Sequence, residues 1–134
     1  MSQENVEIVR AAFDAFERDD MNGVLSLCDP EIEITQAADL LGAPQHMHGH
    51  AGVLEAIAVF GPEQWDDYRI EVISMTDLGD RVMVKQMSRG RGKGTGIPVE
   101  MLFTFLYLVR AGKIMEWRIF TREDEALEAV GLAE

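Results

Sequence analysis

Apolar residues recur every three or four positions near the start of the chain, which is the spacing of an amphipathic helix. The stripe in residues 2–20 consists of Val6, Val9, Phe13 and Phe16. A second, shorter helix is predicted over residues 20–28, with Asp20 as its N-cap, because Asp29-Pro30 ends the pattern. Residues 50–60 carry a third predicted helix.

Alternation of apolar and polar residues predicts the strands. They cover residues 31–35, 66–75, 81–88, 97–109 and 113–120. Residues 37–49 are predicted to form a loop and residues 89–96 a glycine-rich connection, while residues 121–132 read as a short helix with Thr121 as its cap. Three helices mixed with one strand, followed by four strands in succession, predict a single α+β domain over residues 1–134, with helices covering one side of an antiparallel sheet.

The strand over residues 97–109 is apolar on both faces. One face carries Leu102, Leu106 and Leu108. The other carries Met101, Phe103, Phe105 and Tyr107. A sheet with one wet face alternates cleanly, so both faces of this strand are expected to be covered. Because the helices cover only one side, we expect a homodimer through the outer sheet face, formed by Met101, Phe103, Phe105 and Tyr107.

Composition and charge narrow the function classes. The 134 residues are 47% hydrophobic, enough for one core, and carry a net charge of −12, which disfavours a nucleic-acid partner. The first residues are polar, and no apolar run is long enough to span a membrane, so a soluble, cytoplasmic protein is expected. Cys28 is the only cysteine and is interpreted as a small buried hydrophobe.

All three histidines lie in one short stretch, at positions 46, 48 and 50. A shared metal ion would need a third protein ligand, and His50 falls where a helix is predicted to begin, so no metal and no cofactor are expected. His48, in the loop from the first predicted strand to the third helix, is a candidate acid or base, and Asp39 is a second candidate. Alternatively, His46 and His48 are exposed loop residues and His50 helps to cap the following helix.

Several stretches resemble the SnoaL-like branch of the ketosteroid-isomerase-like superfamily, also called nuclear-transport-factor-2-like. They are residues 1–34, "GHAGVLEAI", "RGRGKGTG" and "GKIMEWRIFTREDEALEAVGL". The resemblance implies a cone-shaped, curved antiparallel sheet wrapped around three N-terminal helices, a short C-terminal helix and an apolar pocket inside. It also implies dimers through the outer face of the sheet. Enzymes of this superfamily include steroid isomerases, polyketide cyclases, dehydratases and epoxide hydrolases.

The family's catalytic residues are largely missing from this chain. The position that matches the carboxylate base of the steroid isomerases is Gln36, and the positions that match their oxyanion hole are Ala12 and Thr104. The positions that match the charged triad of the epoxide hydrolases hold Gln86, Ser88 and Ile119. An amide cannot act as a general base, and a hydroxyl donates more weakly than a carboxylic acid.

The resemblance therefore predicts a small-molecule-binding protein with an apolar pocket and no recognisable catalytic set. The predicted lining consists of Phe13, Phe16, Ile34, Gln36, Gln86, Leu102, Thr104, Leu106, Trp117 and Ile119. An active cyclase, isomerase or hydrolase that uses a non-standard acid or base, such as His48 or Asp39, is the alternative. A third hypothesis is a module whose dimer surface matters and whose pocket is vestigial.

Overall fold

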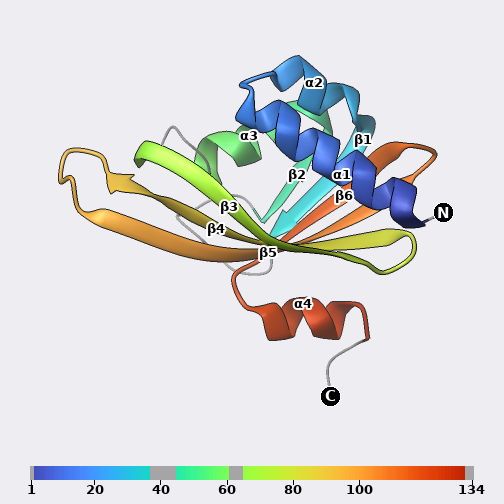
Figure 1. Ribbon diagram of the computed structural model, residues 1–134. Coiled ribbons are helices and arrows are strands. Elements are labelled where there is room, and N and C mark those ends of the chain that lie inside the picture. The colour runs from blue at the N-terminus through green and yellow to red at the C-terminus, as the bar shows by residue number, and fades with distance from the viewer. Residues whose placement is uncertain (1, 37–44, 61–64, 132–134) are drawn as a thin grey trace.

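The computed structural model describes residues 2–36, 45–60 and 65–131 of the chain. Its helices are α1 (Ser2–Glu17), α2 (Met21–Ser26), α3 (Gly49–Phe60) and α4 (Glu123–Ala129). Its strands are β1 (Cys28–Gln36), β2 (His46–His48), β3 (Trp65–Asp77), β4 (Arg81–Gly92), β5 (Pro98–Arg110) and β6 (Lys113–Phe120). A curved sheet wraps around the first three helices, as Figure 1 shows, which confirms the predicted α+β class and cone-like arrangement.

The strands lie in the order β2-β1-β6-β5-β4-β3. All neighbouring pairs are antiparallel except β1 and β6, which run parallel, with Ile34 opposite Trp117. The prediction of a wholly antiparallel sheet is therefore wrong at this one pair. Strand β2 lies inside residues 37–49, which the sequence indicated as a loop, because three residues are too short for alternation to be seen.

The helix caps follow the sequence at one end of the chain and depart from it at the other. The Asp20 side chain accepts a hydrogen bond of 2.9 Å from the backbone N–H of Gly23, which confirms it as the cap of α2. Thr121 does not cap α4. Arg122 occupies that position without a side-chain cap bond, because its guanidinium donates to Asp124 at 2.7 and 3.0 Å.

Strand β5 presents the opposite face to the one the sequence indicated. Phe105 lies opposite Val84 and Ile119, and Tyr107 lies opposite Trp117. Paired residues share a face of the sheet, so the odd-numbered side chains of β5 point toward the helices. Phe103, Phe105 and Tyr107 belong to the main core, with Met101 packed against it. Assigning these four residues to an outer dimer face is therefore corrected.

The outer face of the sheet is partly covered by the chain itself. Helix α4 lies on the side opposite the other helices (Figure 1), where Leu106, Phe120 and Ala126 form a small second core with Met83. The expectation that all helices share one side is corrected accordingly. Leu102 remains 38% exposed on this outer face, and the homodimer stays a prediction.

None of the helices among the described residues has the length and apolar character needed to cross a membrane.

Candidate functional site

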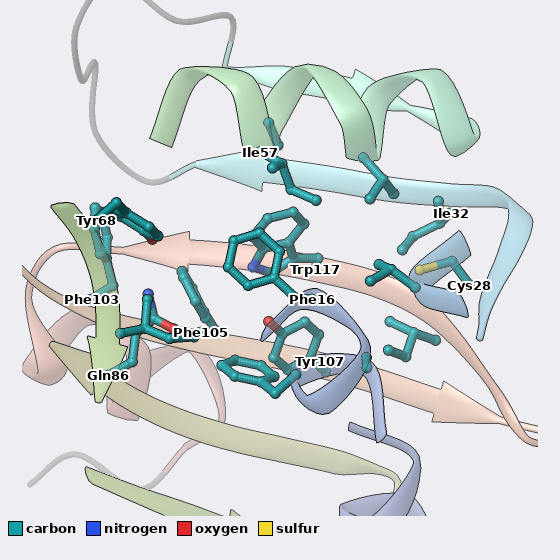
Figure 2. A pocket seen from close by; sticks show the side chains of 17 residues that line it. Phe16, Cys28, Ile32, Ile57, Tyr68, Gln86, Phe103, Phe105, Tyr107 and Trp117 are labelled. Carbon is teal, nitrogen blue, oxygen red and sulfur yellow. The ribbon is translucent and has the colours of Figure 1, made fainter. Parts of the chain in front are cut away.

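An apolar cavity lies between the helices and the inner face of the sheet. Its volume is about 100 Å³. Its walls come from α1, α2, α3 and strands β1, β3, β4, β5 and β6. Figure 2 shows Tyr68 and Gln86 toward one end, Cys28 and Ile32 toward the other, and Trp117 between them.

The middle of the cavity wall is aromatic. The indole of Trp117 stacks on Tyr107, with ring centres 6.2 Å apart, and meets Phe105 edge-on at 5.4 Å. From α1, Phe13 meets Tyr107 edge-on at 6.3 Å. Such ring pairs contribute beyond the burial of area and hold each ring in one orientation. Trp117 is therefore fixed from two sides.

One end of the cavity carries a small polar network. The Tyr68 hydroxyl lies 3.3 Å from the Ser88 hydroxyl, and the Gln86 amide donates to the same Ser88 oxygen at 3.1 Å. Burial raises the pKa of Tyr68 above its usual value, although the hydrogen bonds to Ser88 and Gln86 act in the opposite direction. These polar groups thus satisfy one another and remain neutral.

Tyr68 lies within a bulge of β3. The register with β4 shifts between Asp66 and Arg69, and Asp67 has a φ of 54°, in the left-handed region. A bulge re-aims the side chains that follow it, and bulges are common beside functional sites. The chain thereby accepts local strain where Tyr68 enters the cavity.

The other end of the cavity is apolar and uncharged. Burial raises the pKa of the Cys28 thiol to about 11, against a weaker lowering by Lys113. Burial also raises the pKa of Tyr107 well above its usual value near 10. Together with the raised pKa of Tyr68, this keeps all three ionisable groups of the lining protonated and neutral at physiological pH.

A surface hollow adjoins the cavity and shares part of its wall. Phe16, Ile57, Tyr68 and Ile70 line both spaces. Charged residues, among them Arg69, stand in the wall of the hollow but not in that of the cavity. The hollow therefore places charged side chains next to one wall of the apolar cavity.

The family model for the SnoaL-like domain matches residues 9–117. The chain belongs to the SnoaL-like family. A search of curated proteins found no match.

Solved structures with this fold resemble the SnoaL-like chain over most of its length. TerC, co-crystallised with polyporic acid, is 24% identical, with a TM-score of 0.76 over 93% of this chain and 96% of TerC. An NTF2-like protein from Burkholderia xenovorans is 28% identical, with a TM-score of 0.70 over 89% of each chain. A Catenulispora acidiphila protein with a ketosteroid isomerase-like fold, in complex with trimethylamine, is 20% identical, with a TM-score of 0.68 over 94% of this chain and 93% of that one.

The structure brings together four of the predicted lining residues, namely Phe13, Phe16, Gln86 and Trp117. The other six lie elsewhere. Ile34 and Ile119 are buried in the core of the inner face but do not reach this cavity, and Gln36 is buried at the end of β1.

The last three predicted lining residues, Leu102, Thr104 and Leu106, lie on the outer face of β5. Thr104 pairs with Lys85 and Phe120, away from the cavity. The match to the isomerase oxyanion hole placed Thr104 inside, and because both faces of β5 are apolar, the sequence did not reveal that it lies on the other face.

Thirteen of the seventeen lining residues were not anticipated, among them Tyr68 and Cys28. Tyr68 is predicted to share a strand face with Ile70, and both line the cavity. The alternation in residues 66–75 therefore indicated that Tyr68 and Ile70 share a face. It did not indicate whether that face turns toward the helices. Cys28 is buried as predicted, but it begins β1 instead of ending a helix, so it faces the cavity.

The three histidines lie outside the cavity lining of this SnoaL-like protein. His46 pairs with Glu33 on the exposed side of β1 and β2, and His48 lies 3.0 Å from a carboxylate oxygen of Glu31. His50 Nε2 donates to the carbonyl oxygen of Cys28 at 2.9 Å, which ties the start of α3 to β1.

The described residues hold no group of three or more histidine, cysteine or acidic side chains arranged to bind a metal ion. The second candidate acid or base, Asp39, lies outside the described residues.

Proposed function

We propose that this SnoaL-like protein binds a small, neutral and largely apolar molecule in its cavity. The observation that carries the proposal is the composition of the wall. Among the described residues, the lining includes no aspartate, glutamate, histidine, lysine or arginine. A pocket of apolar and aromatic side chains with a few convergent polar groups is the usual form of a small-molecule site.

The same wall argues against acid–base chemistry by the described residues. Proton transfer near neutral pH needs a group whose pKa lies near the working pH. The ionisable lining residues are Cys28, Tyr68 and Tyr107, and burial shifts all three away from neutrality. Ligand binding without turnover is the reading that these shifts support.

Two structural relatives support a small organic ligand. Polyporic acid is present with TerC, and trimethylamine is present with the Catenulispora protein. Two proteins of this fold have thus each been crystallised with an organic molecule. We extend to this chain only the general point that its cavity takes an organic molecule.

The catalytic alternative requires an acid or base from outside the described lining. His48 lies on the outer sheet face beside Glu31, so it is not placed to act on a molecule in the cavity. An enzyme of the cyclase, isomerase or hydrolase type would need another group, such as Asp39.

The proposal is tested by filling the cavity. Ala12 lines the cavity from α1, whereas Ala11 is exposed on the same helix. We expect toluene and α-methylstyrene to raise the thermal midpoint of the natural protein and of Ala11→Leu, but not that of Ala12→Leu. The reason is that the larger side chain at position 12 occupies the ligand's space.

Native mass spectrometry of freshly purified protein adds a second readout, because a co-purified molecule should be present on Ala11→Leu and absent from Ala12→Leu. Equal responses of both variants to the probes would show that binding occurs elsewhere and would overturn the proposal.

A further inference from the structure

We propose that the ligand is a neutral molecule with a single ring, and that an acceptor oxygen on it takes a hydrogen bond from the indole N–H of Trp117. This inference rests on the proposed function, since it names the ligand class for the same cavity.

The size of the cavity limits the number of rings in the ligand. An apolar cavity of about 150 Å³ binds benzene, and the cavity here is about 100 Å³. Because this volume is below the one that binds benzene, a single ring already fills the cavity, and a short substituent has to extend toward the adjoining hollow that shares Phe16 and Tyr68. A ligand with several fused rings would require the walls to move apart.

The electrostatics of the cavity wall limit the charge that the ligand can carry. Cys28, Tyr68 and Tyr107 stay protonated, and no charged side chain among the described residues lines the cavity. A charged ligand would lose its hydration and find no counter-charge, which is strongly unfavourable. A neutral molecule avoids that loss.

The indole N–H of Trp117 is the group expected to form a hydrogen bond with the ligand. Among the described residues, its Nε1 is the one buried side-chain nitrogen or oxygen without a hydrogen-bond partner. An indole nitrogen is a donor only, and a buried donor left unpaired is costly. Tyr68, Ser88 and Gln86 bond to one another, so they do not supply the missing acceptor.

The direction of the N–H group is already fixed. Tyr107 stacks on the indole and Phe105 meets it edge-on, so the ring needs no ordering when a ligand arrives. In the view of Figure 2, the nitrogen of Trp117 is on the side of the ring turned toward Tyr68 and Gln86. An acceptor from the cavity therefore adds a bond without an entropic cost at Trp117.

Access to the buried nitrogen requires one side chain to yield. Phe16 is only partly buried, and it lines both the cavity and the adjoining hollow. A shift of this ring would connect the two spaces and open a path toward Trp117. Phe16 contacts Tyr68 edge-on at 6.4 Å, so Tyr68 is expected to adjust with it.

Two ligands of nearly the same shape test the polar contact. Acetophenone carries a carbonyl oxygen where α-methylstyrene carries a methylene group. We expect acetophenone to bind the natural protein about 3–10-fold more tightly by calorimetry, as one added neutral hydrogen bond implies. In a ¹H–¹⁵N spectrum, acetophenone should move the Trp117 indole resonance downfield, and α-methylstyrene should not.

Trp117→Phe keeps an aromatic ring and removes the donor, so it should bind the two ligands equally while retaining the affinity for α-methylstyrene. Trp65→Phe is the matched control, because Trp65 is the other tryptophan and does not line the cavity. It should preserve the preference for acetophenone.

Three results would overturn the inference. The first is no preference for acetophenone in the natural protein. The second is an equal loss of both ligands in Trp117→Phe, which would indicate packing alone. The third is binding of larger apolar molecules but of neither one-ring probe. In that last case the cavity function would stand, provided that Ala12→Leu abolishes the binding, and only the ligand class would fail.

Discussion

The two faces of one sheet differ sharply, although the same strands build both. On the inner face, aromatic rings pack around a cavity, and its polar groups bond to one another. On the outer face, Arg89 pairs with Glu71 at 2.9 Å and also with Glu100, and His46 pairs with Glu33. Buried groups are costly to leave unpaired, whereas exposed ion pairs remain hydrated and contribute little.

The contrast appears between adjacent residues of β5. Phe103 is 1% exposed and stacks on Phe105, whereas Leu102 is 38% exposed on the opposite face. Both are large apolar residues, so their identity alone does not reveal their energetic roles. The face on which a side chain lies decides how much stability it contributes.

The largest effect is expected from Phe103→Ala. The change should lower the free energy of unfolding by about 3–5 kcal/mol, because it enlarges a cavity within a packed aromatic cluster. Leu102→Ala is the matched control and should cost under about 1 kcal/mol in the monomer, since the leucine already contacts water. Urea denaturation followed by far-UV circular dichroism measures both.

Equal losses for Phe103→Ala and Leu102→Ala would contradict the assignment of the two faces. Sedimentation equilibrium on the same samples separates folding from assembly. If the protein is a homodimer through the outer face, Leu102→Ala should weaken association while the fold remains intact.

A smaller effect is expected at alkaline pH. Burial holds the pKa of Cys28 at about 11 in the folded chain, against 9.0 for an unperturbed thiol. The folded state therefore keeps its proton while the unfolded state loses it. The stability that Cys28 contributes is complete below pH 9 and falls by about 2 kcal/mol as the pH rises to 11.

Urea unfolding of the natural protein and of Cys28→Ala at pH 8, 9, 10 and 11 isolates this contribution. The tyrosines add their own loss above pH 10, but that loss is common to both proteins. Parallel stability curves for the two proteins would refute the account of Cys28.

The smallest effect is expected on the outer face. His46→Ala removes the ion pair with Glu33, in which both side chains are about half exposed. The free energy of unfolding should change by less than about 1 kcal/mol at neutral pH, because water replaces the lost contact. Thermal unfolding at low and high salt provides the measurement, and a loss comparable to that of Phe103→Ala would erase the distinction between the faces.

The sequence predicted the elements better than it predicted the site. The stripe that includes Val9 placed α1, and Asp20 marked the start of α2, because helix spacing and capping are local. The family resemblance supplied the cone-like arrangement. Strand β2 was not predicted, because its three residues are too few for alternation to show.

The cavity depended on one non-local fact, which is the face that β5 turns toward the helices. Both faces of that strand are apolar, so alternation could not choose between Phe103 and Thr104. The pairing of Phe105 with Val84 and of Tyr107 with Trp117 fixes the choice. Trp117 itself was assigned correctly as an inward residue, but no sequence pattern shows that its indole nitrogen lacks a partner.

The parallel pairing of β1 with β6 has a consequence for synthesis on the ribosome. Ile34 finds its neighbour Trp117 only about 80 residues later in the chain. At about 5–20 residues per second, one backbone edge of the first strand stays unpaired for several seconds. Strands β3 to β6 pair in succession, so they can assemble first and offer β6 as a template. Until then the nascent N-terminal half is the portion that a chaperone would recognise.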